Sequence, residues 1–143
     1  MNQINMYVGE DGKLHFVDCE GADTVLPFNH ITSISGIFYA YLTGGNTETY
    51  TTINKLDDAD ITKIIIKVNR QLATSTYIRL ISYKNLNSTI IAQYSNNNQP
   101  PALNTDIEFE ISDAPDYIRI QAQTVSGGQM QYTTVSYVVE FGK

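Results

Sequence analysis

Alternation of apolar and polar side chains is the feature that most constrains how this chain can fold. It is clearest in residues 106–112, 117–123 and 135–141. In the first of these segments every second residue is apolar, and the residues between are acidic or serine. Successive side chains of a strand point to opposite faces of a sheet, so the pattern predicts strands with one buried face.

Residues 61–68 and 77–83 are more apolar and predict more central strands. Glycine, asparagine and proline clusters separate the expected strands and predict turns. Only residues 56–60, with three aspartates, suggest a single helical turn. Together these signals predict an all-β fold, an antiparallel β-sandwich of the jelly-roll kind.

The first 30 residues read as a separate small unit. Strands are expected at residues 6–8 and 14–17, with a turn between them. The segment contains five acidic side chains and only one lysine. We therefore expect a β-hairpin unit over residues 1–30 and a β-sandwich domain over residues 31–143. An isolated hairpin is marginally stable, so the unit should pack on the main body or pair with another chain.

Charge and composition exclude several functions. The chain has 143 residues, a net charge of −6, and nine lysines and arginines scattered through it. Nucleic acids and anionic membrane surfaces require clustered basic residues, so neither partner is expected. No apolar run is long enough to span a membrane, and the N-terminus does not resemble a signal peptide. The single cysteine, Cys19, cannot form an internal disulfide and is expected to be a buried thiol.

Catalytic and metal-binding patterns are weak. The only histidines, His15 and His30, do not have zinc-ligand spacing, and His15 is expected on the surface of a strand. Residues 57–60 offer carboxylates suited to calcium, but without the pattern of a calcium loop. Glu108 and Glu110 share a strand face, which reads as a solvent face rather than a glycosidase pair. We therefore predict no enzyme, no cofactor and no metal; a small hydrolase remains a third hypothesis.

Tyrosines and loop asparagines are the candidate binding residues. Tyr77 and Tyr83 share a strand face with Arg79, and Tyr94 precedes an asparagine-rich loop. Tyrosine rings and amides often hold sugars, so one end of the sandwich is expected to present them together. The candidate ligand-binding residues are Tyr83, Asn85, Asn87, Tyr94 and Asn97. The alternative is that tyrosine is simply a good strand residue and asparagine a good turn residue.

Two segments resemble known proteins. Residues 8–18 (VGEDGKLHFVD) and 21–28 (GADTVLPF) are similar to the N-terminal segment of tail and virion-associated proteins of phages and prophages from Gram-positive bacteria. Residues 105–120 (TDIEFEISDAPDYIRI) resemble the strand–turn–strand end of jelly-roll modules in phage fibres and carbohydrate-binding proteins, although here proline follows alanine. In this segment Arg119 is expected on the outer face.

The resemblance implies a virion structural or host-surface-binding role and no catalytic residues. The leading hypothesis is a non-enzymatic tail or virion protein, made in the bacterial cytoplasm, that contacts host surface glycans. Its partners would be copies of itself or other virion proteins, because exposed strand edges with few lysines invite pairing. The alternative is a free-standing bacterial carbohydrate-binding module.

Overall fold

The computed structural model describes residues 5–10, 14–25 and 32–142. The chain divides into two compact units, residues 1–32 and residues 33–143. Every regular element in the described residues is a β-strand, and all strand pairs are antiparallel. His30 and the end of the predicted N-terminal unit lie outside the described residues.

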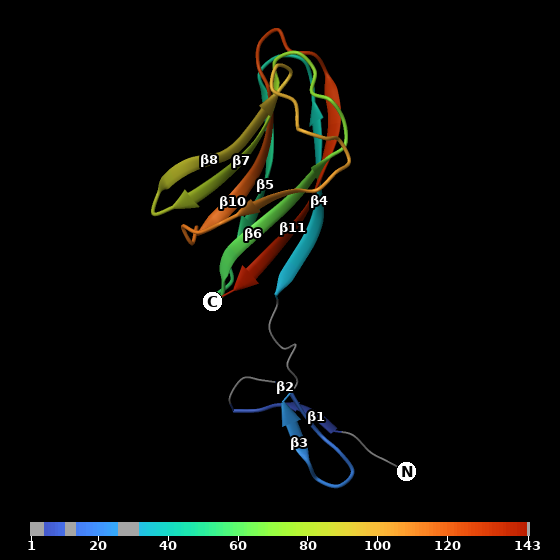
Figure 1. Cartoon of the computed structure of the whole chain (residues 1–143), viewed down its shortest axis with the longest axis vertical. Coiled ribbons are helices and arrows are strands. Elements are labelled where there is room, and N and C mark those ends of the chain that lie inside the picture. The colour runs from blue at the N-terminus through green and yellow to red at the C-terminus, as the bar shows by residue number, and fades with distance from the viewer. Residues whose placement is uncertain (1–4, 11–13, 26–31, 143) are drawn as a thin grey trace. The chain divides into compact units, whose positions relative to one another are not determined.

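The smaller unit is a three-stranded sheet rather than a hairpin (Figure 1). Its strands are β1 (Asn5–Val8), β2 (Leu14–Val17) and β3 (Asp23–Val25), in the order β1-β2-β3. The turn before β3 is built by Asp18, whose Oδ1 accepts hydrogen bonds of 2.9 Å from the backbone N–H groups of Glu20 and Ala22. Gly21 supplies the positive φ of 86° that this reversal needs. β3 has only three residues, too few for an alternating pattern to reveal it in the sequence.

The larger unit is an antiparallel β-sandwich of two four-stranded sheets, which confirms the predicted fold class (Figure 1). One sheet has the order β5-β10-β7-β8 and the other β4-β11-β6-β9. The strands are β4 (Ser33–Leu42), β5 (Thr47–Asn54), β6 (Asp60–Val68), β7 (Thr76–Lys84), β8 (Asn87–Ser95), β9 (Ile107–Glu110), β10 (Tyr117–Thr124) and β11 (Gln131–Gly142).

The predicted alternation accounts for the core between the two sheets. In β10 the exposure changes at every residue, with Ile118, Ile120 and Ala122 at most 1% exposed. Ile64, Ile66 and Val68 of β6, and Ile78 and Leu80 of β7, are buried in the same cluster. Burying each of these isoleucine, leucine and valine side chains contributes about 1.5–3 kcal/mol, so these inward positions hold the two sheets together.

Residues 56–60 form a tight reversal between β5 and β6, not the predicted helical turn. The backbone N–H of Leu56 donates to the carbonyl of Ala59 at 3.1 Å, and the two residues form an isolated antiparallel bridge. Both side chains pack against the core. The chain must therefore turn back within two residues, Asp57 and Asp58, which leaves no length for a helical turn.

Side-chain amides anchor the connection between β6 and β7. The buried Gln131 accepts a hydrogen bond from the backbone N–H of Ala73 at 3.0 Å and donates to the carbonyl of Gln71 at 2.7 Å. Gln99 likewise accepts from the N–H of Leu72 and donates to its carbonyl. These amides replace the sheet partners that a loop backbone lacks, so they fix a segment without regular structure.

Candidate functional site

The outward face of the sheet β5-β10-β7-β8 carries most of the aromatic and basic side chains of that sheet. The register aligns Tyr117 of β10 with Tyr83 of β7, and Arg119 with Thr52 of β5 and Ile81 of β7. We call this surface the aromatic–arginine face; it consists of Tyr50, Tyr77, Arg79, Tyr83, Tyr117 and Arg119. It is built by strand alternation, because the same strands send their isoleucines into the core.

Arg119 lies at the centre of three tyrosine rings. Its Cζ is 4.3 Å from the ring centroid of Tyr50, 5.1 Å from that of Tyr83 and 5.4 Å from that of Tyr117. The rings of Tyr83 and Tyr117 stack with centroids 4.6 Å apart and an interplanar angle of 13°. Such cation–π contacts contribute about 0.5–1 kcal/mol each at exposed sites, so they hold the guanidinium in place.

Arg79 is held differently, by amides. Its Nε donates to Gln93 Oε1 at 2.9 Å, and one terminal nitrogen donates to Gln123 Oε1 at 3.1 Å. Its Cζ is 5.3 Å from the ring centroid of Tyr77. The two arginines thus sit on one face at fixed positions, one among rings and the other among amides.

The outward positions next to the two arginines hold one apolar side chain, Ile81, and one amide, Gln121. Ile81 points outward but is only 8% exposed, and it does not belong to the core cluster. Gln121 lies between Tyr50 and Arg79 across the sheet, and its buried Oε1 has no hydrogen-bond partner among the described residues. An unpaired buried acceptor costs about 1–3 kcal/mol, so this amide is the group on the face that gains most from a new donor.

The predicted binding residues do not gather at one end of the sandwich. Tyr83 belongs to the aromatic–arginine face, and Asn85 and Asn87 lie nearby, around the turn between β7 and β8. Because β7 and β8 are antiparallel, Asn97 follows the opposite end of β8. The expectation of one shared end is therefore wrong, whereas a binding role for these residues stays a prediction.

Tyr94 points toward the core and not toward solvent. It pairs with Ile78 of β7, a core position, and packs against the hydrophobic cluster. Burial raises the pKa of its hydroxyl above the usual value. A one-residue bulge in β8, opposite Leu80 and Ile81, changes which residues of β8 face outward on either side of it. Sequence alternation alone does not reveal such a bulge.

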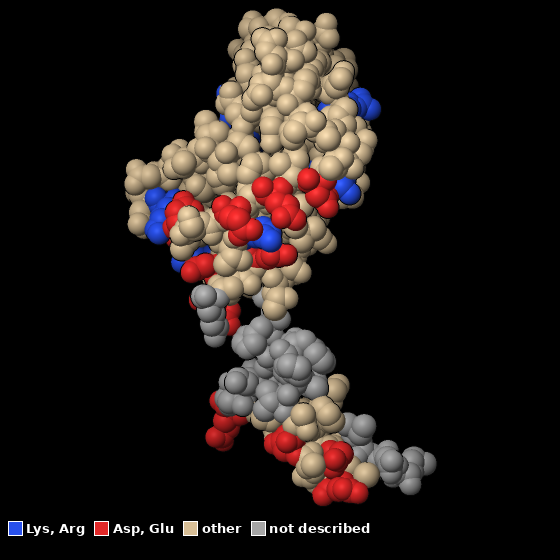
Figure 2. All heavy atoms as spheres, in the orientation of Figure 1, with Lys and Arg blue, Asp and Glu red and all other residues tan. Residues whose placement is uncertain are grey.

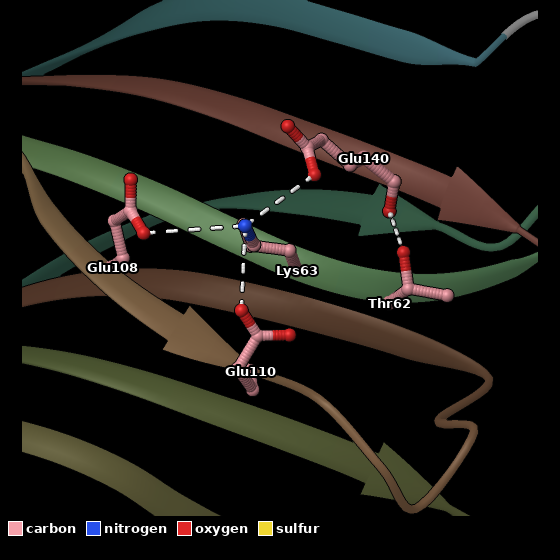
Figure 3. Close-up of polar contacts among 5 residues, drawn as sticks. All are labelled: Thr62, Lys63, Glu108, Glu110 and Glu140. Atoms are coloured by element: carbon pink, nitrogen blue, oxygen red, sulfur yellow. Dashed lines mark hydrogen bonds and ion pairs between the residues drawn. The ribbon is translucent and has the colours of Figure 1, made fainter.

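Glu108 and Glu110 form the solvent face of an edge strand, as expected, around a shared lysine (Figure 3). Lys63 Nζ lies 3.3 Å from Glu110, 3.9 Å from Glu140 and 4.0 Å from Glu108. The hydrogen bond and charge of Glu110, followed by the charges of the other two carboxylates, raise the pKa of this lysine. Figure 2 shows charged side chains gathered over the half of the larger unit that holds its C-terminus.

The outer surface of the other sheet has a hollow of about 330 Å³, next to exposed apolar and aromatic side chains of β4. Ile37 is 53% exposed, and both Tyr39 and Tyr41 are 61% exposed along the edge strand β4. The hollow is lined by Ser35, Gly36, Ile37, Ile65, Lys67, Asp106, Ser136, Tyr137 and Val138. Its only charged lining residues, Lys67 and Asp106, pair with each other at 3.6 Å, so the hollow is neutral.

The smaller unit corrects two expectations. Cys19 is exposed, not buried, because it lies in the turn before β3. The His15 side chain is only 12% exposed, because its ring stacks on Tyr7 at 5.0 Å and its Nδ1 lies 3.1 Å from Asp23 Oδ1. The Tyr7 hydroxyl donates to the other oxygen of Asp23 at 2.7 Å. The His15 ring is shielded from solvent because β1 and β3 lie on either side of β2 and supply Tyr7 and Asp23.

Residues 5–10, 14–25 and 32–142 contain no group of three or more histidine, cysteine or acidic side chains arranged to hold a metal ion. Over the same residues, no helix is long and apolar enough to cross a membrane.

Fold and surface together define an all-β protein with a small three-stranded unit and an antiparallel β-sandwich. No family model and no curated protein matches the sequence. A crystal structure of PirA is 7% identical, with a TM-score of 0.42, covering 80% of this chain and 99% of that one. The SPBc2 prophage-derived protein YomS is 14% identical, with a TM-score of 0.43, covering 78% and 97%. A carbohydrate-binding module of the β-sandwich superfamily is 10% identical, with a TM-score of 0.40, covering 100% and 75%.

Proposed function

We propose that this chain is a non-enzymatic structural protein of a phage or prophage particle that contacts host surface glycans through its β-sandwich. The observation that carries the glycan contact is the aromatic–arginine face, with Tyr50, Tyr83 and Tyr117 around Arg119. The particle role rests on the resemblance of residues 8–18 and 21–28 to tail and virion-associated proteins. Residues 105–120 add a resemblance to jelly-roll modules of phage fibres and carbohydrate-binding proteins.

The face suits a sugar for physical reasons. Tyrosine combines a large apolar ring with a polar hydroxyl, so it can stack on the C–H face of a sugar and still meet its hydroxyls. Tyr50 is 49% exposed, which leaves much of its ring open to a ligand. Gln121 and the neighbouring amides offer both donors and acceptors. Rigid strands hold these groups, which limits the entropy lost on binding.

We expect replacement of Tyr50 by alanine to weaken glycan binding about five- to tenfold, because the most exposed ring of the face is lost. The measurement is titration of a glycan selected on an array of bacterial wall polysaccharides. Tyr39→Ala is the matched control, since Tyr39 is 61% exposed on the other sheet. Loss of binding in the control and not in Tyr50→Ala would place the ligand elsewhere.

The smaller unit supports the assembly part of the proposal. Met6 and Val8 lie on one face of β1 and are 67% and 70% exposed. Three short strands bury little apolar surface, and pairing with another chain would cover more of it. We propose that residues 1–30 join copies of this chain, or join it to other particle proteins.

Removal of residues 1–30 is expected to convert an oligomer into a monomer, because the joining surface is lost while the sandwich core stays whole. Size-exclusion chromatography with light scattering measures the mass of both proteins. Equal subunit numbers for the full chain and the shortened chain would contradict the assembly role.

A free-standing carbohydrate-binding module is the second candidate. It is favoured by the location of the aromatic–arginine face, which lies wholly within the larger unit. Under this alternative the full chain would be monomeric, and residues 31–143 alone would bind the glycan as tightly as the full chain.

A further inference from the structure

Charge on the aromatic–arginine face differs in sign from that of the whole chain. The chain has a net charge of −6. On the outward positions of β5, β10, β7 and β8, all within the described residues, the basic side chains are Arg79 and Arg119 and the acidic one is Glu48. The face is therefore locally positive, whereas the hollow on the opposite sheet is neutral.

Arg119 has hydrogen-bond donors that can bind a ligand. A guanidinium carries five N–H donors, and it keeps its charge at any physiological pH. Within the described residues the only hydrogen bond of Arg119 is the one from Nε to Thr52 Oγ1, at 3.4 Å. Neither terminal nitrogen donates a hydrogen bond to any residue that the structure describes, while three tyrosine rings fix the position of the group. Arg79, by contrast, already donates to two glutamines.

We infer that the aromatic–arginine face takes an anionic glycan, one whose sugars bear carboxylate or phosphate groups, with Arg119 as the forked donor to the anion. This inference rests on the proposed glycan-contacting function and adds the ligand class. A guanidinium matches both anions geometrically, since two parallel N–H groups can meet two oxygens.

The side chains next to Arg119 contact other parts of the glycan. Tyr50 offers an exposed ring for the sugar body beside the anion site. The buried Oε1 of Gln121 gains a partner if a sugar hydroxyl enters between Tyr50 and Arg79. The rings around Arg119 exclude part of the surrounding water, which strengthens the ion pair relative to one on an open surface.

The test compares polymers that differ only in charge. The carboxylate arm uses polygalacturonate and its fully methyl-esterified form, and the phosphate arm uses a phosphorylated mannan before and after dephosphorylation. Calorimetric titration of the full chain is expected to show at least about tenfold tighter binding to a charged member than to its neutral partner. Raising the salt from about 0.05 M to about 0.5 M should weaken binding of the charged member alone.

Two substitutions locate the effect. Arg119→Gln should remove at least about tenfold of the affinity for the charged polymer, and Arg119→Lys should restore only part of it because lysine lacks the fork. Arg70→Gln is the matched control: it changes net charge equally, but Arg70 lies beside Tyr132, a residue of the other sheet. Unchanged melting temperatures would show that the variants fold.

Equal affinity for charged and neutral polymers, or no effect of Arg119→Gln, would overturn the inference and leave the glycan-contacting function standing. Equal losses in Arg119→Gln and Arg70→Gln would also overturn it, because net charge alone would explain them. No binding to any of the four polymers, and none on an array of bacterial wall polysaccharides, would overturn both.

Discussion

Replacing Ile78 by alanine is expected to lower the free energy of unfolding of the larger unit by about 3–4 kcal/mol. Ile78 is 1% exposed on β7 and belongs to the core cluster between the two sheets. The substitution removes three carbon atoms from a packed site whose neighbours are held by strand hydrogen bonds on both sides. The loss therefore includes a cavity term as well as the lost transfer free energy.

Ile90→Ala is the matched control. Ile90 lies on the adjacent strand β8 but is 54% exposed, so its truncation should cost less than about 1 kcal/mol. Urea unfolding followed by far-ultraviolet circular dichroism measures both values. Equal destabilisation by the two substitutions would mean that the space between the sheets is not the main source of stability.

Replacing Gln131 by alanine is expected to cost about 2–3 kcal/mol, although no charged or large apolar group is lost. Gln131 is 6% exposed, and its amide satisfies the N–H of Ala73 and the carbonyl of Gln71. Alanine would leave two backbone groups near the interior without partners. The cost comes from these unpaired groups rather than from the missing side chain.

Gln129→Ala provides the comparison, because Gln129 is exposed and its side chain makes no hydrogen bond within the described residues. Its effect on unfolding should be within about 0.5 kcal/mol. Hydrogen exchange of the Ala73 amide gives a local measurement, and faster exchange is expected only in Gln131→Ala. A stability of Gln131→Ala equal to that of the unsubstituted chain would show that water replaces the amide at no cost.

The fold class could be predicted because alternation can be seen within one short segment, although it arises from the packing of one sheet on the other. Each strand of the sandwich has one face against the other sheet, so the pattern in residues 117–123 already separates Ile118 and Ile120 from Arg119. The alternating pattern does not reveal the order of the strands within each sheet. That order depends on long-range pairing, here β10 between β5 and β7.

Local exceptions were missed for a related reason. The turn at Asp57 and Asp58 has the composition of a helix start, but the bridge between Leu56 and Ala59 decides its shape. Tyr94 stands before a polar loop, yet the bulge in β8 leaves it on the core side. Cys19 has the character of a buried residue, and a turn of the smaller unit exposes it. In each case a turn or a bulge, rather than the preference of the residue type, decides where the side chain lies.

Only some residues of the candidate site could be predicted from the sequence. Alternation places Tyr77, Arg79 and Tyr83 on one face of β7, and Arg119 on the outer face of β10. Tyr50 could not be added, because nothing in the sequence pairs β5 with β10. Its ring is nevertheless nearest to Arg119 among those around it. A site assembled across strands requires the register, which no single segment carries.

The pairing of β4 with β11 has a practical consequence for protein engineering. Ser33, the first residue of β4, lies opposite Glu140, two residues before the end of β11, so the β-sandwich is entered and left at neighbouring points of one sheet. Adjacent ends of this kind permit circular permutation and insertion into a loop of a host protein. The sandwich could thus be displayed as a cassette with both linkers at one corner.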